Sequence, residues 1–510
     1  MSMMEQTVGA LRGGEMADSM IAGLIPRFVG RTVLVLGDVM LDRYVSGEVS
    51  RISPEAPIPV LRVTSSRASL GGAANVAHNV AALGARAILL GVIGTDDAGA
   101  EIERLVATAG DGIDARLVAA RHRRTTAKTR FTTRSTHQLL RVDDETVDPL
   151  DDESAAELRR RFARALPESD VVVLSDYAKG VLGDRLLKGV VNLSRRARRP
   201  VIADPKRASF RAYRNVTVLT PNAQEATRAT GVEATDDDGA ERAARIALDA
   251  AACDAVIVTR SESGLTLVRR DMPTLHLPAR VQEVADVSGA GDTFVAALAA
   301  ALAGDGDLVK ATRLANIAAG ISVARPGTAV VSGRDLAEEL RRRNVIASEE
   351  KIMIAEAALL QRIAEWRRRG LRIGFTNGCF DLIHPGHVHL LAQARAACDR
   401  LGVALNTDLS VRRLKGPERP IQSEAARATV MSSLASVDLV VLFAEDTPLS
   451  LIDAIRPDVL VKGADYRPEQ VVGADIVRRN GGKVLLVDLL PSQGTTATIA
   501  RVRERTRAAG

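Results

Sequence analysis

The sequence has few cysteines and few aromatic residues. Its 510 residues include three cysteines, Cys253, Cys379 and Cys398, and aromatic residues make up 3% of the chain. No two of these cysteines stand at metal-ligand spacing, so the sequence supports neither a disulfide framework nor a zinc site, and a reducing cytoplasm fits. Because aromatic side chains are scarce, Val, Leu, Ile and Ala must fill the cores.

The sequence also lacks a large excess of either charge. Its 69 basic and 63 acidic residues leave a formal net charge of +6, and its short arginine clusters at 195–198 and 341–343 are typical of solvated helix faces. We therefore expect neither nucleic acid nor a membrane among the partners. Residues 1–28 lack the pattern of a signal peptide and are expected to form an N-terminal extension.

Length and hydrophobic pattern predict two domains. A chain of 510 residues exceeds the size at which one core stops growing. Between residues 29 and 345, short β-rich apolar runs alternate with helical stretches, which predicts a mostly parallel α/β sheet covered by helices. A charged helical junction is expected at 346–370, and a smaller doubly wound α/β domain at 371–510.

Polar residues follow five of the apolar runs in the first domain. Ligands of open α/β sheets bind beyond the carboxyl ends of the strands, so these side chains are expected to meet at one rim of the sheet. The residues are Asp38, Asp176, Asp204, Asn222 and Arg260.

The segment SGAGDTF at residues 288–294 predicts phosphoryl transfer. Its glycines expose backbone N–H groups just before an apolar helical run, where a developing anionic phosphoryl group can be bound. Asp292 is the candidate general base, and Gly289, Ala290 and Gly291 would form the anion hole. The alternative is that Asp292 only caps the helix.

Four segments together resemble the ribokinase-like carbohydrate kinase family over most of the first three hundred residues. They are GDVMLDRY from residue 37, LGGAANVAHNVAALG from residue 70, TPNAQEA from residue 220, and SGAGDTF. The resemblance implies a ribokinase-like domain with a small β lid, expected at 49–61 and 121–134. The arginines of the second lid segment suit a sugar that already carries a phosphate.

The same resemblance implies a set of sugar-binding residues. Carboxylates and amides bond to hydroxyl groups, and glycines let a ligand approach the backbone closely. The implied residues are Asp38, Asp42, Gly71, Gly72 and Asn75.

The nucleotide side of this domain is expected to include Asn222, Glu225, Lys206 and Arg260. Asn222 and Glu225 resemble the family's NxxE motif, which organises Mg²⁺ and phosphate through water rather than by direct ligation. Taken alone, NxxE would be an ordinary helix start and Lys206 an ordinary solvated lysine. The implied cofactors are ATP with Mg²⁺, and a K⁺ requirement is left open.

A second motif, TNGCFDLIHPGH at residues 376–387, predicts a different chemistry. His384 and His387 open a helix directly after an apolar strand, from which both can donate hydrogen bonds to a nucleoside triphosphate. An isolated HxxH is usually incidental, but GCFDLIHPGH is similar to the cytidylyltransferase-like superfamily, which implies a Rossmann-like nucleotidyltransferase domain. The absence of a KMSKS loop argues against an aminoacyl-tRNA synthetase.

That resemblance implies further functional residues. Lys415 lies in a basic segment that resembles the loop closing on phosphates, and it is counted as catalytic together with the two histidines. For Asp408, helix capping is an equally good interpretation. Gly494 stands where related enzymes commonly carry serine. The expected nucleotide-binding residues are Thr376, Asn377, Phe380, Asp381, Asp408, Lys462, Thr495 and Thr496.

The two domains in this order resemble the family of bifunctional heptose enzymes. The resemblance implies ATP-dependent phosphorylation of D-glycero-β-D-manno-heptose 7-phosphate at C1, and adenylyl transfer from ATP to the heptose 1-phosphate, giving ADP-heptose for lipopolysaccharide core synthesis. Because the sequence contains no DxD-type phosphatase nucleophile after a strand, a separate bisphosphate phosphatase is expected to act between the two reactions. A cytoplasmic homodimer is also expected.

Three alternatives remain open. The nearest is another sugar kinase fused to a CTP-dependent, glycerol-phosphate-type cytidylyltransferase. A second makes one half a nucleotide-sensing module without turnover, which the presence of Asp292 and of the two histidines opposes. The third is an RNA-binding protein with a synthetase-like fold, which the dispersed charge opposes.

Overall fold

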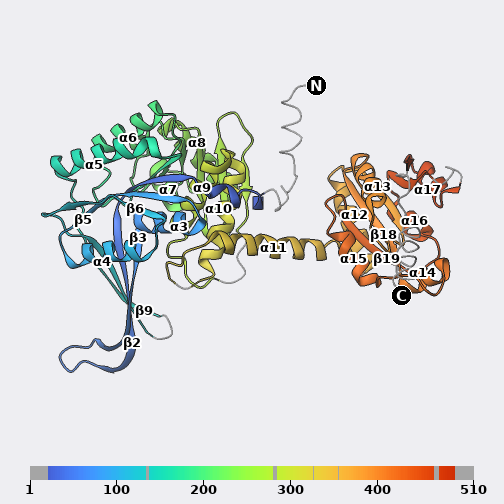
Figure 1. Cartoon of the computed structure of the whole chain (residues 1–510), viewed down its shortest axis with the longest axis horizontal. Coiled ribbons are helices and arrows are strands. Elements are labelled where there is room, and N and C mark those ends of the chain that lie inside the picture. The colour runs from blue at the N-terminus through green and yellow to red at the C-terminus, as the bar shows by residue number, and fades with distance from the viewer. Residues whose placement is uncertain are drawn as a thin grey trace, which may run out of the picture. The chain divides into compact units, whose positions relative to one another are not determined.

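The computed structural model describes residues 21–133, 137–279, 284–325, 327–353, 355–464 and 470–488. The chain divides into two compact units, Met1–Leu340 and Arg341–Gly510 (Figure 1). Helix α11 (Gly333–Glu349) runs across the boundary between them.

The first unit is built on a nine-stranded sheet in the order β15-β14-β13-β12-β11-β10-β1-β4-β6. Its strands pair in parallel except for β14 and β15, which run antiparallel at one edge. All six residues of β1 are buried, as expected for a parallel strand covered on both faces. The predicted, mostly parallel α/β sheet is therefore confirmed. The strands are β1 (Thr32–Gly37), β4 (Arg86–Leu90), β6 (Ile113–Ala115), β10 (Val171–Ser175), β11 (Val201–Asp204), β12 (Val218–Leu219), β13 (Ala255–Thr259), β14 (Leu265–Arg269) and β15 (Leu275–Leu277).

Helices cover both faces of this sheet. Val33 and Val35 pack into one apolar cluster with α3, α9 and α10, while Leu34 and Leu36 pack into a second cluster with α5, α6 and α8. Successive side chains of a strand point to opposite faces, so one apolar run supplies both cores. The helices are α3 (Ala73–Leu83), α4 (Asp97–Thr108), α5 (Asp152–Ala165), α6 (Asp184–Arg196), α7 (Ala223–Thr230), α8 (Asp237–Ala251), α9 (Ala290–Asp305) and α10 (Leu308–Val323).

A second sheet of four strands, in the order β3-β2-β8-β9, forms the predicted small lid. Its long β2–β3 hairpin projects away from the central sheet in Figure 1. Because β2 begins just after β1, the base of the lid lies at the carboxyl end of the central sheet. The strands are β2 (Val39–Ile52), β3 (Pro59–Gly72), β8 (Thr126–Thr133) and β9 (Gln138–Asp144), and a separate parallel pair is formed by β5 (Val92–Gly94) and β7 (Val118–Ala120).

The core of the first unit includes part of the expected N-terminal extension. Ile21, Leu24 and Phe28 are at most 2% exposed and belong to the same apolar cluster as α9. Residues 21–28 therefore fold with the kinase-like unit.

The second unit has a six-stranded, all-parallel sheet in the order β16-β19-β18-β17-β20-β21. The strand order reverses between β17 and β20, which is where doubly wound folds bind ligands. This topology confirms the predicted Rossmann-like fold. The strands are β16 (Ile352–Met353), β17 (Ile373–Gly378), β18 (Arg400–Asn406), β19 (Leu439–Phe443), β20 (Val459–Gly463) and β21 (Lys483–Val487).

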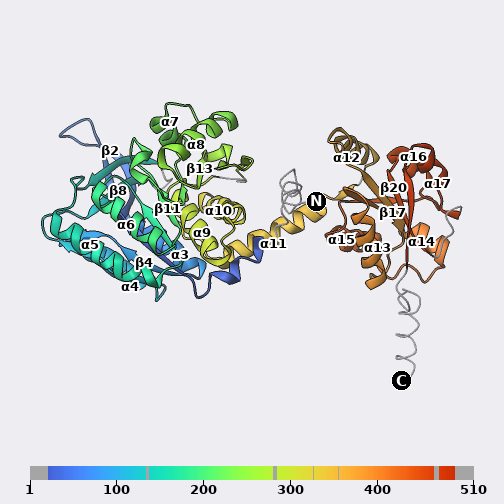
Figure 2. The same cartoon turned by 90° about the horizontal axis from the view of Figure 1, so that it is seen from above.

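Helices flank this sheet too. Helices α12, α16 and α17 cover one face, and α13 and α15 cover the other (Figure 2). The segment expected as a helical junction, 346–370, holds the end of α11, edge strand β16 and helix α12, and Ile352 pairs with Val440. The helices are α12 (Glu356–Arg368), α13 (Pro385–Ala396), α14 (Asp408–Lys415), α15 (Glu424–Ser432), α16 (Leu449–Ile455) and α17 (Ala474–Arg479).

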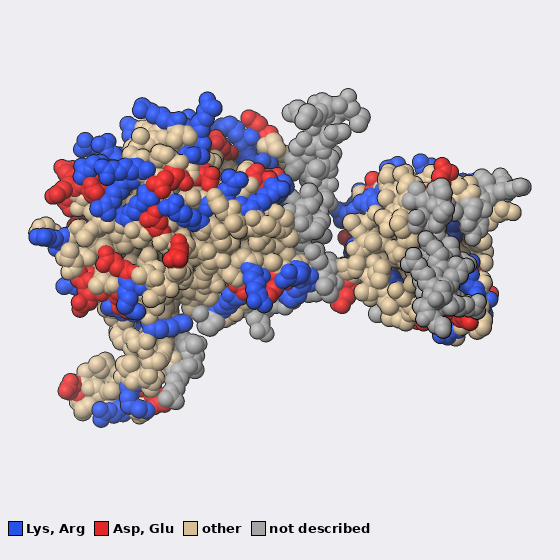
Figure 3. All heavy atoms as spheres, viewed as in Figure 1, with Lys and Arg blue, Asp and Glu red and all other residues tan. Residues whose placement is uncertain are grey.

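Charged side chains of both signs are intermixed on the face of the molecule shown in Figure 3. That distribution agrees with the dispersed charge of the sequence. Within the described part of the chain, no helix has both the length and the apolar composition needed to cross a bilayer.

Candidate functional sites

Asp292 lies in the first turn of α9, is 4% exposed, and accepts a hydrogen bond on each carboxylate oxygen. Asn75 Nδ2 donates to Oδ2 and Tyr177 Oη donates to Oδ1, both at 2.8 Å. Burial raises the pKa of Asp292 to about 6, and the two hydrogen bonds oppose that rise. Asp292 is thus charged at neutral pH, with a pKa near the working range of a general base.

Two of the sugar-binding residues implied by the resemblance, Asn75 and Asp42, act directly on Asp292. Asn75 contacts Asp292 directly, and the charge of Asp42 contributes to the raised pKa of Asp292. At Gly71, an added Cβ would lie 2.5 Å from Asp42 Oδ2, so a side chain there would displace the Asp42 carboxylate. Gly72 follows Gly71 and precedes helix α3.

Asp38 lies in the same region, but its carboxylate is occupied. It is 1% exposed and accepts hydrogen bonds from the backbone N–H groups of Tyr177, Lys179 and Val181 at 2.7, 3.1 and 3.2 Å. Its carboxylate therefore holds the loop after β10, and the structure does not support its expected role as a sugar ligand.

A cavity of about 130 Å³ gathers several predicted nucleotide-binding residues, namely Lys206, Asn222 and Glu225, beside Gly291 of the predicted anion hole. Asn222 and Glu225 form a capping box at the start of α7, with both hydrogen bonds at 2.9 Å. Lys206 Nζ lies 2.7 Å from Glu225 Oε1. The helix-start interpretation of NxxE is thus confirmed, and the same residues also line the cavity. Its other lining residues are Asp176, Tyr177, Asp204, Pro205, Thr220, Thr259, Phe294 and Val295.

Arg260 and the predicted anion hole agree only in part with the sequence-based prediction. Arg260 is 7% exposed and pairs with Asp237 at the start of α8, so its guanidinium does not line the cavity. In the predicted anion hole, Gly289 has φ 77°, a left-handed conformation that glycine adopts readily. Gly291 lines the cavity, whereas the Ala290 N–H donates to Val287 O at 3.4 Å.

Two carboxylates at the cavity fit a hydrated Mg²⁺. The pKa of Asp204 is raised well above its usual value, first by burial and then by the charges of Glu225 and Asp292. A divalent cation would relieve this crowding of negative charge. Among the described residues, no group of three or more His, Cys, Asp or Glu side chains could hold a metal ion alone. Asp204 and Glu225 would therefore bind the ion largely through its waters.

In the second unit, His384 occupies the N-cap position of α13 without a side-chain capping hydrogen bond, and its ring stacks on that of His387 with centroids 3.7 Å apart. Phe380 contacts His387 at a centroid distance of 5.0 Å. Burial lowers the pKa of His384, and it lowers that of His387 to about 4, so both rings are neutral at pH 7. Nδ1 of each histidine and Oδ1 of Asn377 are buried without a hydrogen-bond partner among the described residues. Such buried, unpartnered polar atoms at the strand-order reversal indicate a ligand site.

Other predicted residues connect the strands at this reversal. Lys462 Nζ donates to Asn377 O at 3.1 Å, joining the ends of β20 and β17. Thr376 Oγ1 donates to Val461 O at 2.9 Å and is 1% exposed, so its hydroxyl is used within the sheet.

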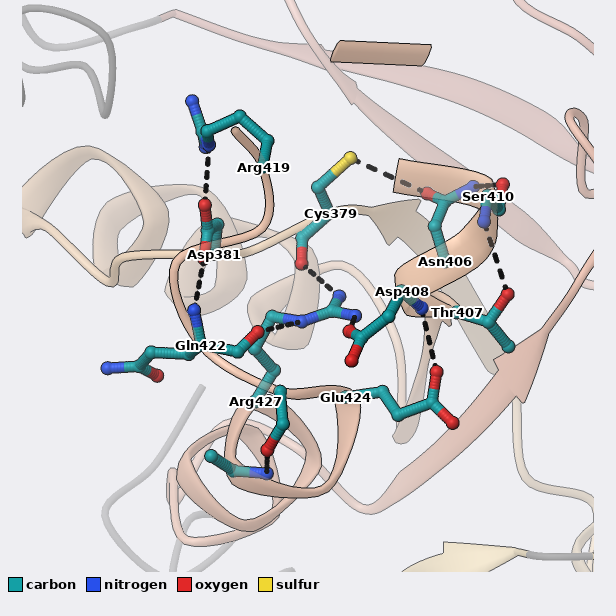
Figure 4. Close-up of polar contacts among 12 residues, drawn as sticks. Cys379, Asp381, Asn406, Thr407, Asp408, Ser410, Arg419, Gln422, Glu424 and Arg427 are labelled. Carbon is teal, nitrogen blue, oxygen red and sulfur yellow. Dashed lines mark hydrogen bonds and ion pairs between the residues drawn. The ribbon is translucent and has the colours of Figure 1, made fainter. Parts of the chain in front are cut away.

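Asp381 holds a neighbouring loop (Figure 4). It is 1% exposed and accepts hydrogen bonds from the backbone N–H groups of Ile421 and Gln422 and from Arg419 Nε, at 2.8, 3.0 and 2.6 Å. The hydrogen bonds of the Asp381 carboxylate are thus made within the protein, so it is not open to a nucleotide. Lys415, at the end of α14, is exposed.

Arg427 was missed by the sequence analysis. Its side chain is fully buried and donates to Cys379 O, Gln422 O and Asp408 Oδ1 at 2.7, 3.2 and 2.7 Å (Figure 4). Arg427 therefore links the start of the histidine motif to the end of β18. An arginine within the helical run EAARATV carries no signal that separates it from a solvated one.

The cap of α14 is Thr407, whose Oγ1 accepts from Ser410 N, so the capping interpretation of Asp408 is wrong. Asp408 is the first residue of that helix and the carboxylate partner of Arg427. Gly494, Thr495 and Thr496 lie outside the described residues.

Comparisons with known proteins match both units. Residues 31–332 match the model of the pfkB family of carbohydrate kinases, and residues 375–478 match the cytidylyltransferase-like model. Bifunctional protein HldE of Caulobacter vibrioides is 54% identical over 95% of this chain and 99% of its own length. The chain belongs to the HldE family of bifunctional proteins. As a member of this family, it combines a carbohydrate kinase with a nucleotidyltransferase.

Solved structures show the fold of the kinase unit. Arabidopsis thaliana ribokinase, complexed with ribose and ATP, matches with a TM-score of 0.50 and 20% identity over 61% of this chain and 99% of that chain. Escherichia coli phosphofructokinase-2, in complex with potassium, matches with a TM-score of 0.52 and 20% identity over 62% of this chain and 99% of that chain. The kinase unit of this HldE family member therefore has a ribokinase-like fold.

Proposed function

We propose that the first unit phosphorylates D-glycero-β-D-manno-heptose 7-phosphate at C1 with ATP. We propose further that the second unit transfers the adenylyl group of ATP to D-glycero-β-D-manno-heptose 1-phosphate, giving ADP-heptose and pyrophosphate for lipopolysaccharide core synthesis in the cytoplasm. The observation that carries the first reaction is the buried Asp292 carboxylate, which lies at the N-terminus of α9 between Asn75 and Tyr177.

In the kinase reaction, Asp292 takes the proton of the C1 hydroxyl as its oxygen attacks the γ-phosphorus of ATP. The bond from that phosphorus to the bridging oxygen breaks, and ADP leaves. Gly291 and Lys206 line the cavity where negative charge would build up. Bound Mg²⁺ would neutralise phosphate charge, held through water by Asp204 and Glu225.

Two arginines of the lid support a phosphorylated sugar as the acceptor. Arg67 and Arg130 lie over the Tyr44 ring at 4.5 and 5.2 Å, and Arg130 also pairs with Asp42. Arg67 is exposed and has no carboxylate partner among the described residues. A guanidinium in that position can bind a phosphate at the far end of the sugar.

In the second reaction, a phosphate oxygen of the heptose 1-phosphate attacks the α-phosphorus of ATP, and pyrophosphate leaves. No covalent intermediate with the protein is needed, so positioning and charge stabilisation account for the rate. Neutral His384 and His387 donate hydrogen bonds to the phosphates from the start of α13, where the helix dipole also favours negative charge. The choice of ATP over CTP follows the family resemblance.

The two reactions are separated by loss of the 7-phosphate, which we assign to a separate phosphatase. Purified protein incubated with ATP and heptose 7-phosphate should accumulate the 1,7-bisphosphate, and mass spectrometry should detect ADP-heptose only after a 7-phosphatase is added. Heptose lacking the 7-phosphate serves as the acceptor control, and CTP serves as the nucleotide control. Formation of ADP-heptose without phosphatase, or of a nucleotide sugar with CTP alone, would overturn this assignment.

We also propose that the protein is a homodimer paired through its lids. The lid exposes apolar side chains that a second lid could cover, including Ile52, Ile58 and Val63 at 61%, 57% and 54% exposure. Light scattering should report a dimer, and Ile52→Glu combined with Val63→Glu should give a monomer. A wild-type monomer at micromolar concentration would contradict this proposal.

A further inference from the structure

The loop after β10 is fixed at a buried carboxylate. Asp38 accepts the backbone N–H groups of Tyr177, Lys179 and Val181, and Asp176 Oδ1 accepts the N–H of Ala178 at 2.8 Å. Ala178 adopts φ 54°, a conformation that a residue with a Cβ rarely takes without such support. A buried carboxylate whose hydrogen bonds all go to this loop indicates that the loop must hold one conformation.

Tyr177 extends from this loop to the proposed base. Its hydroxyl lies 2.8 Å from Asp292 Oδ1, while Asn75 occupies the other carboxylate oxygen. Tyr177 also lines the cavity together with Gly291 and Lys206. Tyr177 therefore connects the Asp292 carboxylate with the cavity in which the nucleotide phosphates are expected.

We infer that Tyr177, held in place by Asp38, is a positioning residue of the kinase whose hydroxyl orients and stabilises the Asp292 carboxylate. The inference rests on the proposed role of Asp292 as the base. It also gives Asp38 a function in the kinase without any contact to the sugar.

The electrostatics of the site support this role. The pKa of Tyr177 is raised well above its usual value, first by burial and then by the charge of Asp292, so the phenol stays protonated and donates. Its hydrogen bond lowers the pKa of Asp292 against the effect of burial. The other ionisable groups acting on these two residues are Asp42 of β2 and Asp204 at the end of β11.

The first test is the pH dependence of kcat/KM for the kinase reaction, measured with ATP and heptose 7-phosphate on the full chain. This quantity reports the free enzyme, the state in which Tyr177 contacts Asp292. Tyr177→Phe removes the donor, so the pKa of Asp292 should rise and the acid limb of the profile should move up by about one pH unit.

The matched control is Tyr213→Phe. Tyr213 is also buried, but its hydroxyl donates to Asp176 Oδ2 at 2.7 Å, accepts the backbone N–H of Lys206 at 3.2 Å, and does not contact Asp292. Its removal should leave the acid limb at the wild-type position. An equal shift in both variants would mean that the pH profile reports general loosening of the site, which would overturn the inference.

A second measurement keeps the inference falsifiable if Tyr177→Phe folds poorly. Replacement of Tyr177 by 3-fluorotyrosine preserves its shape but makes the phenol a stronger donor, so the acid limb should move to lower pH. A purely structural role cannot produce shifts of opposite sign in the two variants. Acid limbs at the wild-type position in both would overturn the inference.

The proposed function and this inference fail in distinguishable ways. If Asp292→Asn retains kinase turnover, Asp292 is not the base and the proposed mechanism falls. If Asp292→Asn is inactive while Tyr177→Phe and the 3-fluorotyrosine protein both keep the wild-type acid limb, only the role of Tyr177 falls.

Discussion

Both sites bury ionisable side chains, but burial opposes the charge that the first site needs and favours the neutral form in the second. Burial raises the pKa of Asp292 to about 6 and lowers that of His387 to about 4, because it favours the neutral form of both groups. The proposed kinase base must be charged, and two hydrogen-bond donors, Asn75 and Tyr177, oppose the effect of burial on Asp292. In the proposed mechanism the histidines act as neutral donors, and burial already favours the neutral form.

The sites also differ in how the chain assembles them. Asn75, Tyr177 and Asp292 come from α3, from the loop after β10 and from α9, which are far apart in the sequence. The histidines belong to one short motif, whose first residues are held by buried Arg427. The kinase site therefore depends on tertiary packing of the whole first unit, whereas the second site depends on one motif and its support.

The largest effect expected in the second unit separates the histidines from the kinase. His387→Ala should lower nucleotidyl transfer by about 10²-fold, the usual cost of losing one preorganised donor, while kinase turnover stays unchanged. Steady-state rates of both half-reactions on one preparation measure this. His389→Ala, two residues further along α13 and so on a different face of the helix, is the matched control and should retain activity. Equal losses in both variants would show that the helix, not the imidazole, matters.

The next prediction concerns the stability that Arg427 gives to the second unit. Arg427→Met leaves Asp408 and two carbonyls without their buried partner and should lower the unfolding free energy of the second unit by about 3 kcal/mol. The single tryptophan, Trp366, is 4% exposed in the core of that unit, so its fluorescence reports denaturant unfolding there.

The control for Arg427 is Arg395→Met in the same unit. Arg395 is 33% exposed where it pairs with Asp438, and its loss should cost less than about 1 kcal/mol. Kinase activity should survive both changes. Similar destabilisation by the two variants would contradict the supporting role of Arg427.

The smallest expected effect is a difference between the pH profiles of the two reactions. Kinase kcat/KM should fall about tenfold for each pH unit below about 6, as the Asp292 carboxylate becomes protonated. His387, whose pKa is lowered to about 4, should contribute no acid limb near pH 6 to nucleotidyl transfer. Both profiles need correction for the ionisation of the substrates. Coincident acid limbs would mean that the two environments do not differ as described.

The sequence predicted most of the fold because its physical signals are local. Runs such as TVLVLG and VVVLS became the buried strands β1 and β10, and the glycines and apolar run around Asp292 became the start of α9. Edge strand β16 was not predicted, because two residues within a charged helical stretch show no periodicity.

The site was harder to predict where a side chain had two possible partners. An aspartate after a strand can bind a ligand or the backbone, and for Asp38 the choice is made by a loop 139 residues away in sequence. The same holds for Asp381, which pairs with Arg419 and two backbone N–H groups. Tyr177 and Arg427 carried no motif signal, since their roles arise only from tertiary contacts.

The most direct test of the account is Asp292→Asn in the full chain, with both half-reactions measured on the same sample. Loss of the general base should lower kinase turnover by about 10²–10⁴-fold while nucleotidyl transfer stays at the wild-type rate. Kinase turnover near wild type, or a parallel fall of both activities, would contradict two independent active sites with Asp292 as the base of the first.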